Sequence, residues 1–153
     1  RNAMDGGVLA GFPVVDVGVT LLDGSSHSVD SSGMAFEIAG SFALRNGVSN
    51  ARPVLLEPVM KVTITTPDNT QGEVMSDLNS RRAQIVGMMP LGDGTTEIEA
   101  TIPLASMQRY AADLRSITQA QAVFSATLSE YAVVPHMEAE KVIDQYKGTD
   151  EEE

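Results

Sequence analysis

Apolar residues along this chain repeat with two different periods, and each period predicts a different kind of element. Residues 14–22 (VVDVGVTLL) partly alternate and are rich in β-branched side chains, which predicts a strand. Met34, Ile38 and Phe42 recur every four residues, which predicts a helix over about 33–45 with one apolar face. The first third of the chain is therefore expected to contain a strand, a loop and a helix.

The signals around that helix define the loop before it. Asp30, Ser31 and Ser32 precede the helix and offer side-chain oxygens that can cap its N-terminus. Asn46-Gly47 supplies the left-handed residue at which helices commonly end. Residues 23–28 (DGSSHS) are a cluster of turn formers, so we expect an exposed loop between the strand and the helix.

The rest of the chain contains an internal repeat with a spacing of 36 residues. Residues 64–67 (ITTP) match 100–103 (ATIP), and residues 77–80 (DLNS) match 113–116 (DLRS). Each copy predicts a strand that ends at Pro, a helix with an apolar face, and a second strand. The six elements are expected at 59–66, 71–82 and 84–89, and at 96–102, 104–117 and 122–131.

Two such βαβ units in tandem define the fold class. They make βαββαβ, an α+β ferredoxin-like arrangement of four antiparallel strands with both helices on one face. Residues 91–95 (LGDGT) are expected to form the hairpin between the copies, and residues 135–146 a last helix.

The charge balance of the chain is acidic. Ten Lys and Arg residues against 21 Asp and Glu give a net charge of −11. Residues 138–153 hold two basic and seven acidic residues, and residues 147–153 are expected to form a solvated acidic tail. Binding to a polyanion normally relies on clustered Lys and Arg, so composition alone argues against a broad nucleic-acid surface, and no DNA partner is expected.

Several classes of site are excluded by what the sequence lacks. With no Cys and two His there is no disulfide framework, thiolate metal site or His-rich metal site, so no metal is expected. There is no phosphate-binding G-x-x-x-x-G-K-[ST] loop, no G-x-S-x-G and no H-E-x-x-H. No apolar run is long enough to span a bilayer and no signal-peptide pattern is present, so we expect a cytoplasmic protein without a membrane partner and without catalytic residues.

His27 is the strongest candidate for a functional polar residue in the first third of the chain. Its simplest interpretation is a surface residue in a turn. The alternative is a contact tip, because a loop of small polar residues can enter a narrow groove and its His can stack on or hydrogen-bond to an RNA base. The N–H groups of the following helix would suit phosphate oxygens, and Asp30 is expected to act as a cap rather than as an acid.

Four Arg residues lie on or beside the two repeat helices. They are Arg81, Arg82, Arg109 and Arg115. For three of them, Arg81, Arg82 and Arg115, an interaction with the helix dipole is sufficient explanation. The alternative is a small basic strip that contacts RNA phosphate or an acidic protein surface.

Longer motifs resemble one family over residues 1–146. Residues 11–17 (GFPVVDV), 25–32 (SSHSVDSS) and 34–36 (MAF) closely resemble the second half of domain IV of bacterial elongation factor G. Residues 53–62 (PVLLEPVMKV) resemble the passage into domain V of that protein. The resemblance continues through 72–74 (GEV), 77–82 (DLNSRR), 110–111 (YA) and 113–116 (DLRS).

The resemblance implies a domain organisation. It predicts part of a domain IV, similar in fold to ribosomal protein S5, over residues 1–52 and a ferredoxin-like domain V over 53–146. Residues 1–4 (RNAM) fit the end of a domain IV helix, so the chain is expected to be part of a larger protein. GTP and Mg²⁺ would bind in a separate domain of the parent, and this region is expected to have no cofactor and no catalytic activity of its own.

The resemblance also implies a partner, the ribosome, and a role in translocation. The loop would contact the codon–anticodon region of transfer and messenger RNA in the decoding region. It comprises Gly24, Ser25, His27, Asp30, Ser31 and Ser32. His27 would be the contacting residue, and Asp30, Ser31 and Ser32 would shape the loop. Domain V would lie near the stalk base and ribosomal RNA of the large subunit, with Arg81, Arg82, Arg109 and Arg115 as possible contacts.

Four departures from the family pattern favour a divergent member. Ser26 stands where an aromatic residue is usual, Gly33 where an acidic one is usual, and Arg109 where Gly is usual. Ala120-Gln121 replaces a Gly-Arg pair. One alternative is therefore a paralogue that acts in ribosome recycling. Two further alternatives come from other functional classes. They are a ferredoxin-like regulatory module that binds a small molecule between helices and sheet, and a stand-alone hydrolase.

Overall fold

The computed structural model describes residues 2–150, with side chains described for residues 3–147. Its contacts divide the chain into two compact units. One unit is Leu56–Val133, and the other combines Arg1–Leu55 with Val134–Glu153. No helix among the described residues is both long enough and apolar enough to cross a membrane.

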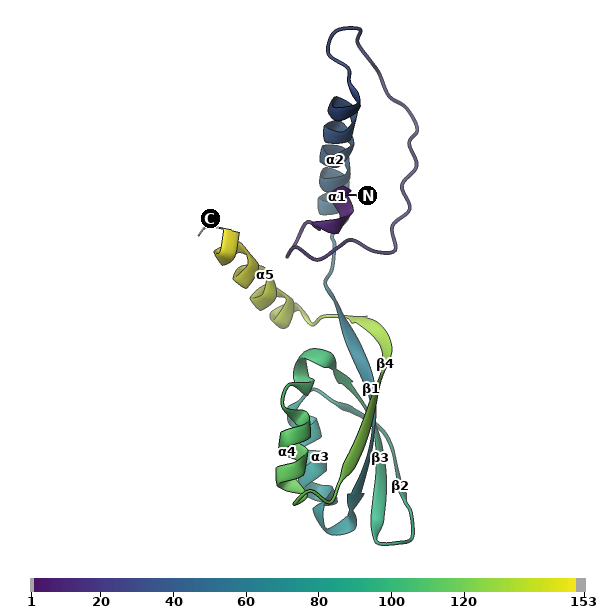
Figure 1. Cartoon of the computed structure of the whole chain (residues 1–153), viewed down its shortest axis with the longest axis vertical. Coiled ribbons are helices and arrows are strands. Elements are labelled where there is room, and N and C mark those ends of the chain that lie inside the picture. Colours follow the sequence, from purple (N-terminus) through teal and green to yellow (C-terminus); the bar gives the residue numbers. More distant parts are fainter. Residues whose placement is uncertain (1, 151–153) are drawn as a thin grey trace. The chain divides into compact units, whose positions relative to one another are not determined.

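The Leu56–Val133 unit is a single antiparallel sheet with two helices on one face (Figure 1). Its strands are β1 (Leu56–Pro67), β2 (Gln84–Pro90), β3 (Thr95–Pro103) and β4 (Val123–Val133), in the order β2-β3-β1-β4. The helices are α3 (Gln71–Ser80) and α4 (Tyr110–Ile117). The predicted α+β ferredoxin-like βαββαβ fold is confirmed.

The core of this unit lies between the sheet and the two helices. Alternate residues of the central strands point into it, among them Val62 and Ile64 of β1 and Ile98 of β3, all with no exposed surface. The helices contribute Val74, Leu78, Tyr110 and Leu114. Full burial of one such aliphatic side chain is worth roughly 1.5–3 kcal/mol, so this layer holds the unit together.

The second repeat helix differs from the prediction. Residues 104–117 do not form one helix: a 3₁₀ turn (Leu104–Met107) is followed by a break and then by α4. At the break Arg109 has a φ of 60°, which is left-handed. The carbonyls of Ser106 and Gln108 accept hydrogen bonds from Arg81 at 3.1 and 3.2 Å. A continuous helix would need those carbonyls for its own ladder, so the Arg81 side chain favours the break.

A second left-handed turn follows α4. Gln119 and Ala120 have φ angles of 52° and 63°, and the turn is held by the Ala120 N–H, which donates to the Arg115 carbonyl at 2.8 Å. The Gln121 N–H donates to the Thr118 carbonyl at 3.0 Å. A side chain in this region costs roughly 1–2 kcal/mol, so Gly would be less strained than Ala at position 120.

We expect Ala120→Gly to stabilise the unit by about 0.5–1 kcal/mol. Relief of the left-handed strain exceeds the extra entropy that Gly gives the unfolded chain. Native-state hydrogen exchange of the buried β1 and β3 amides measures the change. Ala112→Gly, inside α4, is the matched control and is expected to lower stability instead. Equal effects of the two changes would contradict a strained turn at Ala120.

The other unit contains three helices and a long segment without regular structure (Figure 1). The helices are α1 (Asn2–Asp5), α2 (Gly33–Asn50) and α5 (His136–Asp150). The predicted strand over residues 14–22 is wrong, because this stretch is unpaired and bends at Asp16, where φ is 57°. A strand needs a neighbouring ladder, whereas the stretch is joined to other described residues by one backbone hydrogen bond, from the Val14 N–H to the Met4 carbonyl at 2.9 Å.

The ends of α2 and α5 also differ from the expected ones. Helix α2 passes through Asn46-Gly47 and ends at Asn50, where Ala51 caps it and Arg52 takes a φ of 55° before Pro53. The Asn50 side chain donates to the Asn46 Oδ1 at 3.0 Å, which links the last two turns. Proline shortly after the last turn was therefore the better stop signal. Helix α5 extends through Asp150, into the predicted tail, and residues 151–153 lie outside the described part.

Candidate functional site

The loop before α2 is built on the N-terminus of that helix. Ser32 is the N-cap: its backbone is extended, with φ −142° and ψ 165°, and its Oγ accepts the Ala35 N–H at 3.1 Å. Ser31 Oγ accepts the backbone N–H of His27 at 2.7 Å, which closes the tip of the loop on itself. The two Ser side chains thus hold the loop through hydrogen bonds to its backbone.

His27 lies at the tip with its side chain exposed. Its imidazole has no hydrogen bond or ion pair within the part of the chain that the structure describes. The neighbouring residues from 16 to 34 are all exposed as well. An unengaged ring on an exposed loop is available for stacking or hydrogen bonding with a partner.

Asp30 does not have the role expected from the sequence. The cap of α2 is Ser32, and no described hydrogen bond reaches the Asp30 carboxylate. Asp30 lies in the turn just before the cap, two residues too early to reach the first free N–H groups of the helix. Gly24, at the start of the loop, donates its backbone N–H to Asp23 Oδ1 at 2.7 Å.

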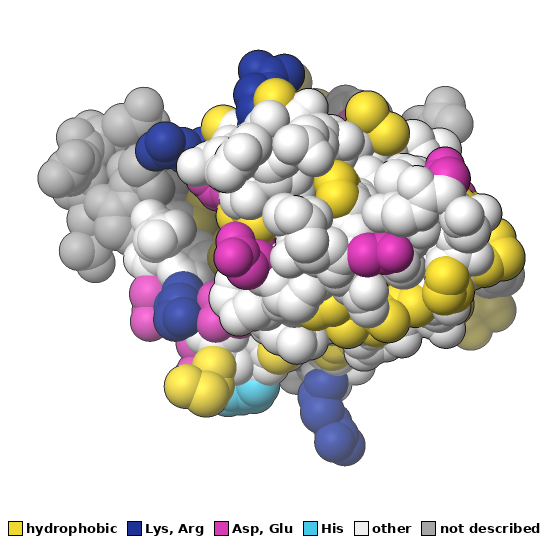
Figure 2. All heavy atoms as spheres, turned by 90° about the horizontal axis from the view of Figure 1, so that it is seen from below, with side chains coloured by type: hydrophobic (Ala, Val, Ile, Leu, Met, Phe, Trp, Pro, Cys, Tyr) yellow, Lys and Arg dark blue, Asp and Glu magenta, His cyan; other side chains and the backbone are white. Residues whose placement is uncertain are grey.

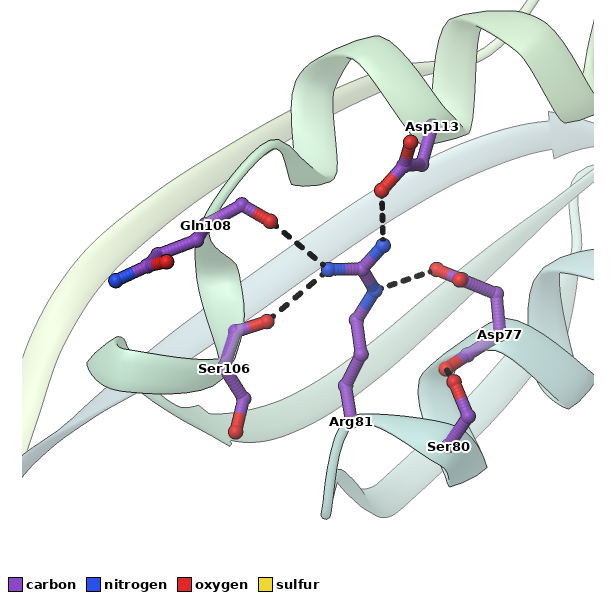
Figure 3. Close-up of polar contacts among 6 residues, drawn as sticks. All are labelled: Asp77, Ser80, Arg81, Ser106, Gln108 and Asp113. Carbon is purple, nitrogen blue, oxygen red and sulfur yellow. Dashed lines mark hydrogen bonds and ion pairs between the residues drawn. The ribbon is translucent and has the colours of Figure 1, made fainter.

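Arg81 lies at the centre of a polar cluster between the two repeat helices (Figure 3). Its Nε donates to Asp77 Oδ2 at 2.8 Å, and its Nη2 to Asp113 Oδ2 at 2.6 Å. Its Nη1 donates to the two carbonyls of the break before α4. The guanidinium also lies over the ring of Tyr110, with its carbon 5.1 Å from the ring centroid. The side chain is only 13% exposed.

The environment of Arg81 fixes both its charge and its position. The hydrogen bond to Asp77 and that to Asp113 raise the pKa of Arg81 against the opposing effect of burial. Burial raises the pKa of Tyr110, whose hydroxyl has no hydrogen-bond partner among the described residues. Arg81 is therefore an internal connector of the fold, and its donors are occupied by groups of the same unit rather than free for an external phosphate.

The remaining Arg residues fall into two kinds. Arg82 forms a two-pronged pair with Glu57 of β1, at 2.5 and 3.3 Å, and is also committed to an internal contact. Arg109 and Arg115 are exposed, and neither has a side-chain partner among the described residues. The face drawn in Figure 2 shows Lys and Arg side chains standing apart from one another with acidic side chains among them. Because Arg81 and Arg82 are committed to carboxylates of their own unit, only Arg109 and Arg115 of the four residues remain available for an external contact.

One functional grouping was missed at the sequence level. Asp77 and Asp113 occupy equivalent positions of the two repeats, and one arginine binds both. The spacing of Asp77 and Arg81, four residues apart on a helix, was a signal for the first of these contacts. Nothing in the sequence pattern marked the second, which depends on how the helices pack. Among the described residues no three acidic or His side chains gather as a metal site would require.

Comparison with known proteins covers nearly the whole chain. The family model described as elongation factor G C-terminus matches residues 54–142, and the model of elongation factor G domain IV matches residues 1–52. The crystal structure of a protein from Thermus thermophilus is similar, with a TM-score of 0.84 at 36% sequence identity. That match covers 97% of this chain and 22% of the Thermus protein, so this chain spans about a fifth of the length of that relative.

Proposed function

Because this chain belongs to the elongation factor G family, we propose that it is the ribosome-binding region of a translational GTPase that promotes movement of transfer and messenger RNA. Two family matches in the family's order, domain IV and then the C-terminus, make the chain a region of a translation elongation factor. The observation that supports the specific role is the exposed His27 loop, held by Ser31 and Ser32 on the N-terminus of α2.

In this proposal the loop is the RNA contact of the decoding region. Its residues are neutral or small apart from Asp23 and Asp30, so they can approach phosphates without strong repulsion. The His27 ring can stack on a base or donate a hydrogen bond to it. Gly24 and Ser25 keep the tip narrow. Recognition of this kind depends on a few placed groups, which the net charge of −11 does not describe.

The large-subunit contact is assigned to two cations at α4. Arg109 and Arg115 are exposed and have no side-chain partner in the described part of the chain, whereas Arg81 and Arg82 are bound to carboxylates of the same unit. An arginine that already binds two carboxylates gains little from a phosphate, since it would first have to break both pairs. We therefore propose Arg109 and Arg115 alone as contacts to ribosomal RNA near the stalk base.

We expect the double variant Arg109→Glu/Arg115→Glu to weaken ribosome binding by about tenfold or more, the cost of losing one charge-assisted hydrogen bond. The affinity is measured by pelleting purified ribosomes together with residues 1–153 over a range of salt concentrations. The matched control is Lys141→Glu/Lys147→Glu on α5, which changes the net charge equally. Equal losses in both variants would indicate a charge effect without contacts, and no binding of the unaltered chain at low salt would refute the proposal.

GTP hydrolysis is assigned to the parent protein rather than to these residues. The sequence has no phosphate-binding loop, so GTP and Mg²⁺ would bind in another domain of the encoded protein. An open reading frame with a P-loop GTPase domain upstream of residue 1 would support this assignment. Translocation and ribosome splitting can both be measured with the full-length parent protein. Activity in translocation would indicate a translocase, and activity in splitting would indicate a paralogue that acts in recycling.

The small-molecule alternative has no observation in its favour. It requires a ligand-sized cavity between the helices and the sheet, where the structure packs Val62, Ile64, Ile98 and their neighbours. An open hollow of about 760 Å³ does occur, but it is lined by residues between Ala3 and Arg45 of the other unit. A thermal shift with metabolites, together with no binding to ribosomes, would favour the small-molecule-binding module over the ribosome-binding region.

A further inference from the structure

Four positions of this chain place a glycine directly after Asp or Asn. They are Asp5-Gly6, Asp23-Gly24, Asn46-Gly47 and Asp93-Gly94. At such pairs the backbone nitrogen of the glycine can attack the side-chain carbonyl carbon of the residue before it, because no Cβ shields that nitrogen. The attack closes a five-membered ring, and it requires a side chain turned toward the next amide and a backbone free to adjust. The structure separates the four positions by these two requirements.

Asp23-Gly24 meets both requirements. The Gly24 N–H donates to Asp23 Oδ1 at 2.7 Å, so the side chain is turned toward the amide that would attack it. Both residues are exposed, and residues 17–27 contain no helix, strand or turn that would hold the backbone. A reacting pair that is already close together gains rate because less ordering remains to be done.

Two of the other positions are restrained. Asn46-Gly47 lies inside α2, and Asn46 Oδ1 accepts a hydrogen bond from the Asn50 side chain at 3.0 Å. At Asp93 the same carboxylate oxygen accepts the N–H of Thr95 at 3.0 Å and its hydroxyl at 2.5 Å. The Gly94 carbonyl accepts the Asp68 N–H at 3.0 Å, which fixes the hairpin on the other side.

Asp5-Gly6 is intermediate. Asp5 is the last residue of the short helix α1, and the next turn is tied back by the Gly7 N–H, which donates to the Met4 carbonyl at 3.3 Å. No described hydrogen bond joins the Gly6 nitrogen to the Asp5 carboxylate. The side chain there is not turned onto its own attacking amide as it is at Asp23.

We propose that Asp23 is a site of spontaneous isoaspartate formation. The Gly24 nitrogen bonds to Cγ of the protonated Asp23 carboxyl group and loses its proton, and one carboxyl oxygen leaves as water. Water then adds to the ring. Opening at Cγ restores aspartate, while opening at the backbone carbonyl leaves isoaspartate, whose main chain runs through the side-chain carbons. One water leaves and one enters, so the mass is unchanged and no oxidant or cofactor takes part.

The modification alters the start of the His27 loop. It lengthens the backbone by one methylene group four residues before His27 and leaves a carboxylate on the α-carbon. Isoaspartate formation does not depend on the proposed function. Its expected consequence does rest on that function: a displaced contact tip and a loss of the protein's activity on the ribosome with age. The modification itself is therefore tested without ribosomes.

The test follows all four positions in one sample of the folded chain. Residues 1–153 are incubated at neutral pH and physiological temperature, and isoaspartate is located by enzymatic methylation and peptide fragmentation. Asp23 is expected to convert about tenfold faster than Asp93, a difference equivalent to about 1.4 kcal/mol in barrier. In urea the ratio is expected to fall toward one, because the restraints on Asp93 are lost.

Two variants make the test specific. Gly24→Ala keeps the carboxylate but shields the nitrogen, and a Cβ at Gly24 meets no atom within 4 Å, so the loop accommodates it. We expect this variant to slow conversion at Asp23 and to leave Asp5 and Asp93 unchanged. Asp23→Glu would need a six-membered ring and is expected to abolish the product at that position. Conversion at Asp23 no faster than at Asp93 in the folded chain, or unchanged in Gly24→Ala, would overturn the proposal.

Discussion

Replacing Arg81 with Met is expected to lower the free energy of unfolding of the Leu56–Val133 unit by about 2–3 kcal/mol. Removing one partner of a buried ion pair typically costs about 3–5 kcal/mol, because the remaining charges are left without compensation. The Asp77 side chain is 18% exposed, so little water can solvate its carboxylate once Arg81 is removed. The Asp113 side chain is 42% exposed, so water can replace part of the lost hydrogen bonding there. The expected cost therefore lies at or below the lower end of that range.

The loss extends beyond the two carboxylates. The carbonyls of Ser106 and Gln108 lose the donor that holds the break before α4, and the Tyr110 ring loses the cation above it. Arg81→Lys keeps the charge but has no planar fork to reach four acceptors, so it is expected to recover only part of the stability. The interaction thus depends on the shape of the guanidinium as well as on its charge.

Native-state hydrogen exchange of the buried amides in β1 and β3 provides the measurement, because it isolates this unit within the full chain. The matched control is Arg115→Met, which removes an exposed arginine without a described side-chain partner and is expected to change stability by less than about 0.5 kcal/mol. If the two variants behaved alike, the cluster around Arg81 would not be a determinant of stability.

His27→Ala in the encoded protein is expected to slow translocation by about tenfold or more while ribosome-dependent GTP hydrolysis stays near its original rate. One hydrogen bond to a charged group is worth about 1.5–3 kcal/mol, and about 1.36 kcal/mol corresponds to a factor of ten in rate. The imidazole makes no described internal contact, so the fold is expected to be unaffected. The loss would therefore report on the partner alone.

The second histidine of the chain supplies the control. His136 is also exposed, and its only described pairing is with Glu140 at 3.5 Å on α5. His136→Ala is expected to leave both rates unchanged. His27→Gln, which retains a hydrogen-bonding group, is expected to recover part of the translocation rate. Unchanged translocation in His27→Ala would refute the role of the loop, whereas parallel loss of GTP hydrolysis would indicate a defect in binding instead.

The sheet and its helices were predictable because the same strand–helix–strand pattern occurs twice in the sequence. Two copies with the same strand–helix–strand pattern leave few ways to bury their apolar faces, and Val62, Ile64 and Leu78 lie where that pattern places them. What the pattern could not supply was the contact between copies, since Arg81 and Asp113 are 32 residues apart and meet only after packing.

The errors have the same physical origin. Residues 14–22 have strand composition, but composition cannot create the neighbouring strand that a ladder needs. The helix expected over 104–117 breaks because a side chain from the other repeat takes its carbonyls. Asp30 and Ser32 are both good caps by type, and only the local geometry decides between them.

The interleaved strand order has an evolutionary consequence. Because β3 lies between β1 and β2, and β1 between β3 and β4, each half contributes an inner strand to the other half. A single half has a gap in the middle of its own sheet, so deleting or exchanging one half of this chain would leave the other half's strands unpaired. Two separate copies of one half could fill each other's gaps as a homodimer. A duplication that joined such a pair into one chain would produce the 36-residue repeat and then allow the two helices to diverge, as the arginine after α3 and the broken entry into α4 have done.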